Sequence, residues 1–373
     1  MPCYKDVHIE KKQQFADFMS RELMPLAQKF DDEQCIPKSF FQKLAVNGFL
    51  GANVPALYGG QEMDYVTLSL LHEEAGKVLC SLENVLTVYG MVCKPLARFG
   101  TKKQKEWLPK IVAGEIIVAI ALTEPNIGSD LKNIQTQAIP SQDYYILNGQ
   151  KKYITLGQIA DLFLVLAKNK TADIALLVER NTPGLSVNPI YDTLGFRSNM
   201  LAEITFEDCQ IPKENIVGSV NGGFVQVIAC ALDEGRFTTA CGCVGLGQAC
   251  LSLAREYANN RVQAETLLKN HQLIQKMMTE MIVQVKASRE ICFNAACLRD
   301  AVDMSYLAET LVAKYFSAKM AMSVAENALD VFGASGFTKE QSIGRFYRDA
   351  KIMSVIEGTS QLFEINIPKI CLD

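Results

Sequence analysis

The sequence has few of the features that mark specialised proteins. In 373 residues it has one tryptophan, three histidines and 12 prolines, and it contains no low-complexity tract. With 49% hydrophobic and 21% charged residues, the composition is typical of a globular protein and excludes a disordered or fibrous chain. The histidines are isolated from serine or cysteine partners in the sequence, so a hydrolase triad is not expected.

Charge of one sign and long apolar runs are also lacking. Lysine and arginine total 37 against 41 acidic residues, a formal charge of −4, and no long basic block occurs. Nucleic acid is therefore not expected as a partner. The longest apolar stretches, such as Ile116 to Leu122, are far shorter than the roughly 20 residues of a membrane span. The N-terminal segment carries Lys5, Asp6 and Glu10 and lacks the apolar core of a signal peptide.

The twelve cysteines show neither CxxC nor alternating Cys/His spacing. Scattered cysteines in a long chain predict reduced thiols, and they argue against a disulfide framework or a metal site. Cys241 and Cys243 lie in helical sequence rich in small residues, which is typical of buried, unreactive thiols. We therefore expect a cytoplasmic protein with no metal ion and no membrane association.

Hydrophobic periodicity divides the chain into three parts. From Lys5 to Val112 apolar residues recur at helical spacing, and after Gly223 this spacing returns in long stretches without proline. Between them lie short apolar or alternating runs separated by turns such as Asn148-Gly149, the pattern of β-strands. Strands gathered in the middle predict an α+β protein rather than a doubly wound sheet. The expected parts are a helical domain over 1–115, a β domain over 116–220 and a helical domain over 221–373.

Three segments have residue types that suit catalysis or cofactor binding. Thr123 to Asp130 offers hydroxyls and backbone N–H groups that can bind a phosphate or a heteroaromatic edge, although its composition is also that of a plain turn. Tyr153 and Thr155 are two residues apart, which predicts one face of a strand. Glu357 follows an apolar pair; it is either a buried general base with a raised pKa or an exposed or helix-capping glutamate.

Taken together and in this order, these segments resemble the acyl-CoA dehydrogenase family of flavoproteins over essentially the whole chain. The matching motifs are Tyr58-Gly59-Gly60, Thr123-Glu124-Pro125, Gly128-Ser129-Asp130, Tyr153-Ile154-Thr155, Phe206-Glu207-Asp208, Gly235-Arg236, Phe332-Gly333, Tyr347-Arg348-Asp349-Ala350-Lys351 and Glu357-Gly358-Thr359-Ser360. The resemblance implies an N-terminal helical domain, a central β-barrel or sandwich domain and a C-terminal four-helix bundle.

The resemblance also implies an FAD-dependent dehydrogenase. Glu357 matches the catalytic base, which removes the proton α to a thioester carbonyl while the β hydrogen leaves as hydride to flavin N5. Hydrogen bonds from the flavin ribityl chain and from the backbone N–H of the base stabilise the enolate. Some relatives carry the base at position 235, which is glycine here. Arg236 matches a position near the substrate.

Nine positions match cofactor contacts of the family. They are Leu122, Thr123, Ser129, Tyr153, Thr155, Arg261, Gln272, Thr359 and Gln361. Arg261 and Gln272 match positions that reach the pyrophosphate and adenosine side of FAD, commonly across a dimer interface. A homodimer or a dimer of dimers is therefore implied.

The chain also departs from the family pattern. The arginine that matches the pyrophosphate position is usually followed by a Phe-Gly pair, but here the run is Arg261-Val262-Gln263-Ala264-Glu265. An acid at Glu265 is unfavourable beside a pyrophosphate unless it points away, so this stretch predicts altered FAD contacts. Other departures are Asp330, Ala334, Ile356 and Glu364.

Some stretches are similar to dehydrogenases of polyketide and hybrid peptide pathways. They are Cys80-Ser81-Leu82, Gly242-Cys243-Val244-Gly245, His271-Gln272-Leu273-Ile274 and Lys351-Ile352-Met353. Those enzymes act on small polar acyl groups tethered to an acyl carrier protein, as in making hydroxymalonyl or aminomalonyl units. The step there is either a CH–CH oxidation or the oxidation of an aldehyde-level carbon.

Three functions stay open at this point. The leading interpretation is an FAD-dependent dehydrogenase of a small acyl group on an acyl carrier protein. The first alternative is a short-chain acyl-CoA dehydrogenase that forms 2,3-enoyl-CoA and passes electrons to an electron-transfer flavoprotein. The second is a catalytically silent relative that only binds a carrier protein; retention of Glu357 argues against it.

Overall fold

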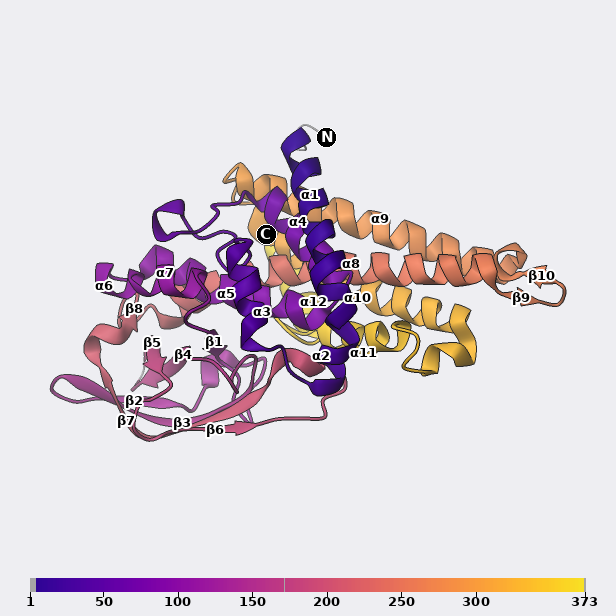
Figure 1. Cartoon of the computed structure of the whole chain (residues 1–373). Coiled ribbons are helices and arrows are strands. Elements are labelled where there is room, and N and C mark those ends of the chain that lie inside the picture. Colours follow the sequence, from indigo (N-terminus) through magenta and orange to yellow (C-terminus); the bar gives the residue numbers. More distant parts are fainter. Residues whose placement is uncertain (1–4, 171, 372–373) are drawn as a thin grey trace.

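Helices make up the first part of the chain in the computed structural model, which describes residues 5–170 and 172–371 (Figure 1). They are α1 (Asp6–Phe18), α2 (Ala27–Glu33), α3 (Lys38–Val46), α4 (Tyr65–Gly76), α5 (Cys80–Phe99), α6 (Lys102–Lys105) and α7 (Trp107–Val112). At the start of α4, the Asp64 carboxylate accepts from the N–H of Thr67 at 2.7 Å, which satisfies a free donor of the helix end. Most residues of α5 are buried, because this helix packs on both β1 and α8.

The central part forms one eight-stranded mixed sheet. Its strands are β1 (Val118–Ala121), β2 (Gln137–Pro140), β3 (Tyr144–Ile154), β4 (Leu162–Asn169), β5 (Ala172–Glu179), β6 (Leu185–Pro189), β7 (Ala202–Pro212) and β8 (Ile216–Val217). The order is β6-β7-β3-β2-β4-β5-β8, with β1 paired in parallel to β4. Most residues of β4 and β5 are buried, in keeping with continuous apolar runs covered on both faces.

Long helices return in the last part of the chain. A π-helical turn over Gly223–Ile228 leads into α8 (Ala229–Asn260), and a hairpin of β9 (Val262–Gln263) and β10 (Thr266–Leu267) follows. The remaining helices are α9 (Gln272–Asp300), α10 (Tyr306–Phe332), α11 (Ile343–Met353) and α12 (Ser360–Cys371). Figure 1 shows α8 and α9 running side by side from the centre of the molecule to the β9–β10 hairpin. The arrangement confirms the expected helical, β and helical architecture.

The helix that includes α8 is long and apolar enough to span a membrane by composition. Within the described parts of the chain it is the one helix that meets this test, over Gly223–Asn260, and 78% of its most apolar window is buried inside the protein. α8 packs against α4, α5, α9 and α10. Its apolar character therefore matches that of a core helix.

The strand prediction for Tyr153 and Thr155 is wrong in its geometry. The pairing of β3 with β7 shifts between Lys151 and Ile154, and Tyr153 has a left-handed φ of 59°. Thr155 lies beyond the end of β3. A bulge of this kind re-aims the side chains that follow it, so the two residues do not share one face of a strand.

Some elements and chain ends fall outside the expectations. β2, β6 and β8 had no clear run in the sequence, and the β9–β10 hairpin lies in a part that was expected to consist of helices. The ends of the predicted first and last domains, residues 1–4 and 372–373, lie outside the described residues.

Candidate active site

A buried ion pair holds the loop that follows β1. The Nζ atom of Lys151, on β3, lies 2.9 Å from Oε1 of Glu124 and donates to the carbonyl of Leu122 at 2.9 Å. Glu124 also accepts from the N–H groups of Gln135 and Thr136. Burial lowers the pKa of Lys151 to about 8 despite the neighbouring carboxylate. The pair fixes the backbone at Leu122 and Thr123, two predicted cofactor contacts.

The rest of this loop is open to solvent. Gly128 and Ser129 are exposed, and a Cβ atom at Gly128 would meet no atom within 4 Å. Among the described residues, no protein group accepts from the backbone N–H groups of Gly128 and Ser129. Free N–H groups in a turn suit a phosphate oxygen, so this loop fits a phosphate-bearing cofactor.

Thr155 lies where the β domain meets α5, and Tyr153 precedes it by two residues, at the irregular end of β3. The Tyr153 side chain is 56% exposed, which is unusual for a large aromatic ring on a sheet. Thr155 Oγ1 accepts from the side-chain amide of Asn84, on α5, at 3.2 Å. The neighbouring Lys152 N–H donates to the Thr123 carbonyl at 2.8 Å, so this strand borders the loop. An exposed ring on such a strand suits contact with a flavin.

Glu357 lies in the short loop between α11 and α12. Its φ is +56°, and that of Gly358 is +108°; a non-glycine residue in this region is uncommon and strained. Two cations of the helical part hold the loop: Arg236 donates from Nε to the Glu357 carbonyl at 3.2 Å, and Lys314 donates to the Met353 carbonyl at 2.7 Å. Both cations also lie 5.7 Å from the ring of buried Phe363.

The Glu357 carboxyl group has the environment of a general base. Oε2 is buried and has no hydrogen-bond partner among the described residues. Burial raises the pKa of Glu357 to about 7. The positive charges of Arg236 and Lys314 oppose this rise, whereas the negative charge of Glu83 adds to it. A carboxylate poised near neutral pH is suited to proton abstraction.

Gly235 makes room for this carboxyl group. A Cβ atom at position 235 would lie 2.6 Å from Oε2 of Glu357 and 2.7 Å from Sδ of Met91. A side chain there and Glu357 in its present place therefore exclude each other. Of the two positions considered for the base, 235 and 357, only 357 has an acidic side chain in this protein.

A chain of buried polar groups lies beside α8. Glu83 Oε1 accepts from Nδ1 of His72 at 2.9 Å and from the Thr87 hydroxyl at 3.0 Å. The Thr87 hydroxyl is 2.9 Å from that of Thr238, which donates to the Gly235 carbonyl at 3.2 Å. Glu83 is not among the residues predicted from the sequence; its signal was a single acid in the apolar first half of α5.

Asp233 and Glu234, the two acids directly before Gly235, are structural. Glu234 is fully buried; its carboxylate accepts from Lys94 at 2.6 Å and from the Asn53 amide. Asp233 pairs with Arg299 at 2.6 Å. Because these carboxylates are already paired, they are poor candidates for a catalytic base.

The remaining predicted contacts fall in two places. Thr359 accepts from the N–H of Leu362 at 3.4 Å and caps α12, and Gln361 is exposed two residues further on, so both lie beside Glu357 in the chain. Arg261 and Gln272 are exposed and flank the β9–β10 hairpin at the far end of α8 and α9 (Figure 1). Within one chain the structure does not bring Arg261 and Gln272 to the Glu357 loop.

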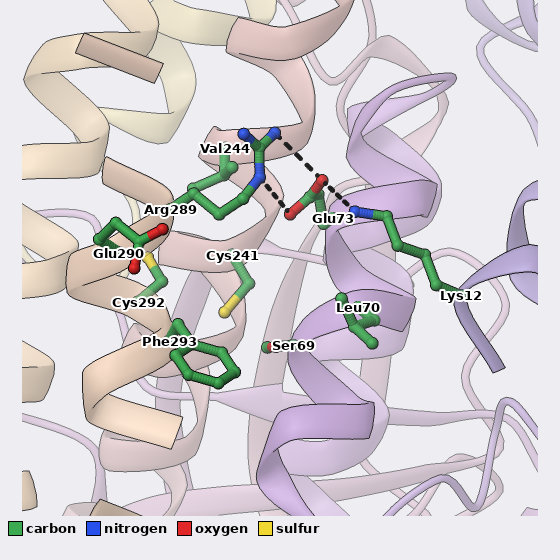
Figure 2. A pocket seen from close by; sticks show the side chains of 10 residues that line it. All are labelled: Lys12, Ser69, Leu70, Glu73, Cys241, Val244, Arg289, Glu290, Cys292 and Phe293. Carbon is green, nitrogen blue, oxygen red and sulfur yellow. Dashed lines mark hydrogen bonds and ion pairs between the residues drawn. The ribbon is translucent and has the colours of Figure 1, made fainter. Parts of the chain in front are cut away.

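A cavity of about 200 Å³ lies elsewhere, between α1, α4, α8 and α9 (Figure 2). On its wall, Glu73 pairs with Arg289 at 3.1 Å and with Lys12 at 3.1 Å. Burial opposes ionisation of Glu73, but these cations and Lys77 bring its pKa to about 2. Cys241 also lines this cavity and is buried, as expected for an unreactive thiol.

Fold and site together define a flavin-dependent oxidoreductase of acyl thioesters. Models of the acyl-CoA dehydrogenase N-terminal, middle and C-terminal domains match residues 5–115, 119–209 and 221–369. The chain belongs to the acyl-CoA dehydrogenase family, whose members bind FAD.

Relatives match along nearly the whole chain. A probable acyl-CoA dehydrogenase, YngJ, of Bacillus subtilis is 34% identical over 95% of this chain and 94% of its own length. A short-chain specific acyl-CoA dehydrogenase of Clostridium acetobutylicum is 32% identical over 95% of each chain. Among solved structures, the prolyl acyl carrier protein oxidase AnaB has a TM-score of 0.94 and 27% identity, with 99% of each chain covered.

Proposed function

We propose that this enzyme oxidises a small acyl group tethered to an acyl carrier protein, with Glu357 as the base. The observation that carries the assignment of the base is the buried, unpartnered Oε2 of Glu357, whose pKa burial raises to about 7. The likeness to AnaB, whose name states a carrier-protein substrate, supports the choice of tether. The motifs around Cys80 and Gly242, which are similar to those of polyketide-pathway dehydrogenases, also support an acyl carrier protein as the tether.

The groups around Glu357 suit the removal of an α proton. Oε2 takes the proton from the carbon next to the thioester carbonyl. The backbone N–H of Glu357 has no hydrogen-bond partner among the described residues and can donate to that carbonyl oxygen as negative charge develops on it. Arg236 and Lys314 hold the loop, and their charges stabilise the carboxylate form of the base before it accepts the proton. Bound FAD supplies the hydride acceptor.

The test is anaerobic flavin absorbance at about 450 nm, a property of the cofactor. Small acyl groups are added on a carrier protein and, in parallel, on coenzyme A. Bleaching with the carrier-bound acyl group alone supports the proposal. Bleaching by both tethers at equal rates overturns the carrier preference, and a Glu357→Gln variant that still bleaches overturns the role of the base.

A second candidate is a short-chain acyl-CoA dehydrogenase that forms 2,3-enoyl-CoA. The observation that favours it is the 32% identity with the short-chain specific enzyme of Clostridium acetobutylicum. The electron acceptor would then be an electron-transfer flavoprotein. Rapid bleaching by butyryl-CoA, with reoxidation by that flavoprotein, would establish this function in place of the first.

We also propose that two copies of the chain pair through α9. Leu273 and Val283 are 73% and 59% exposed on this helix, and apolar side chains of this size on a surface favour an interface. Arg261 and Gln272 lie at the same end of the bundle, from which they would reach FAD in the second copy. Light scattering of the FAD-loaded protein tests this: a monomer would overturn it.

A further inference from the structure

The helices α5 and α8 meet in a seam where a buried acid replaces apolar packing. Glu83 on α5 is fully buried. Its carboxyl group lies against Gly242 of α8, where an added Cβ atom would be 2.5 Å from Cδ of Glu83. Glycine at 242 therefore leaves the space that this carboxyl group fills.

One oxygen of Glu83 has donors and the other has none. Oε1 accepts from His72 and Thr87 at 2.9 and 3.0 Å, which fixes the orientation of the carboxyl group. Oε2 is buried and has no hydrogen-bond partner among the described residues. A buried acceptor without a donor is destabilising, so a donor supplied by a bound molecule would remove that penalty.

The carboxyl group of Glu83 packs on the same helix as the proposed base. Glu357 lies at Gly235 and Glu83 at Gly242, and residues seven apart share one face of an α-helix. Seven residues span about 10 Å. The Glu83 charge acts on both Glu357 and Lys314, which places it within electrostatic reach of the Glu357 loop.

We propose that Oε2 of Glu83 accepts a hydrogen bond from the acyl chain of the substrate, so that the enzyme selects small acyl thioesters bearing a hydroxyl or amino group. This inference rests on the proposed oxidation of an acyl thioester and names its substrate class. Taking the helix rise of about 10 Å between Gly235 and Gly242 as the separation of the two carboxyl groups, contacts of about 3 Å at each carboxylate leave roughly 4 Å between them. That is the length of about three bonds, which places the donor three bonds from the α carbon.

The pair of probes that tests this is 4-hydroxybutyryl and pentanoyl thioester. They differ by a hydroxyl in place of a methyl group, three bonds from the α carbon. Their dissociation constants are measured by calorimetry on FAD-loaded Glu357→Gln protein, which does not turn them over. We expect the dissociation constant of the hydroxylated probe to be at least tenfold lower than that of the pentanoyl probe. In the wild type, we expect the hydroxylated probe to bleach the flavin faster by a similar factor.

Variants at Glu83 separate this role from a structural one. Glu83→Leu should abolish or reverse the preference, and Glu83→Gln, which keeps the shape and one acceptor oxygen, should retain part of it. Ser81→Ala is the control, because Ser81 is a neighbouring buried group on α5 whose hydroxyl also lacks a partner; it should leave the preference unchanged.

The outcomes are distinguishable from those of the proposed function. Equal binding of the two probes, or a preference that survives Glu83→Leu, overturns the role of Glu83 alone. Failure of the protein to bind or oxidise either thioester overturns the proposed function and this inference with it. A preference for the hydroxylated probe that only the Glu83 variants reduce supports both.

Discussion

At the scale of single residues, Glu357 combines a strained backbone with a desolvated carboxyl group. Its left-handed φ of +56° is one that a side chain adopts only when the surroundings enforce it. Here Arg236 binds its carbonyl oxygen and Gly358 allows the chain to turn immediately afterwards. The protein thus holds the acid in place at a cost in stability, as is common at functional sites.

That cost gives the first prediction, a pH-dependent effect of Glu357→Gln. The pKa of Glu357 is about 7 in the folded protein against an ordinary value of 4.5, so the folded state holds an extra proton between these two pH values. Stability then falls as pH rises through this window. The variant removes this loss and should be up to about 3 kcal/mol more stable than wild type at pH 8, with little difference at pH 4.5.

Urea unfolding of the flavin-free protein at both pH values measures this difference. Glu364→Gln is the control, because Glu364 is an exposed partner of Lys319 and such pairs contribute less than about 1 kcal/mol. A stability difference that is the same at pH 4.5 and pH 8 would mean that Glu357 titrates normally.

Gly235 gives a second prediction at this scale. Alanine is about 1 kcal/mol better than glycine inside a helix, but at 235 its Cβ atom would collide with Glu357 Oε2 at 2.6 Å. We expect Gly235→Ala to keep the fold and lower kcat by about a hundredfold, because the base is displaced. Gly90→Ala is the matched control, since its nearest contact is 3.4 Å from Glu234. Wild-type kcat in Gly235→Ala would show that the exact position of the Glu357 carboxyl group does not limit the reaction.

At the scale of elements, two adjacent lysines on β3 should behave differently. Lys151 is fully buried on Glu124, so Lys151→Met leaves a buried carboxylate without its cation and should cost about 3–5 kcal/mol. Lys152 is half-buried and lies 3.4 Å from Glu203; Lys152→Met should cost less than about 1 kcal/mol. Thermal unfolding of both variants measures the difference.

The ion pair of Lys151 with Glu124 links β3 to the candidate cofactor site. Because Lys151 also holds the Leu122 carbonyl, Lys151→Met should loosen the loop and weaken FAD retention, as measured by flavin release on dilution. Equal stability and retention in the two lysine variants would contradict the role of the buried pair.

Periodicity predicted most elements because it reports local burial. The long run from Phe224 and the apolar run of β4 were both visible in the sequence. The edge strand β6 is only five residues long and has no fully buried residue, so its signal was weak. Tyr153 was misplaced because a bulge in β3 depends on the pairing with β7, and no local pattern encodes the partner's register.

At the scale of the whole molecule, the site could be predicted only in part. Glu357 and the loop at Thr123 stood out through motifs that resemble a family, whereas the bond of Glu83 to His72 joins two helices and has no sequence spacing of its own. The clash that excludes a side chain at Gly235 likewise depends on a residue more than 100 positions away. Such contacts follow from packing between distant segments, which single-sequence patterns do not contain.

A buried charge cluster joins the first and last parts of the chain. Arg299 on α9 binds Asp233 at 2.6 Å, and Lys94 of α5 binds Glu234 at 2.6 Å. Arg299 also lies 5.1 Å from the ring of Tyr65, at the start of α4. Removing one member of a buried ionic group leaves its partners uncompensated and typically costs 3–5 kcal/mol.

Arg299→Met should therefore weaken the contact between the N-terminal helices and the bundle as well as overall stability. The single tryptophan, Trp107, lies in α7, so its fluorescence reports on the N-terminal part, whereas circular dichroism reports mostly on the long helices. In Arg299→Met we expect the fluorescence transition to occur at a lower temperature than the dichroism transition. In wild type the two transitions should coincide. Arg21→Met is the control, because it removes only an exposed pair with Glu22, and its two transitions should also coincide. Coincident transitions in Arg299→Met would show that apolar packing alone couples the two parts.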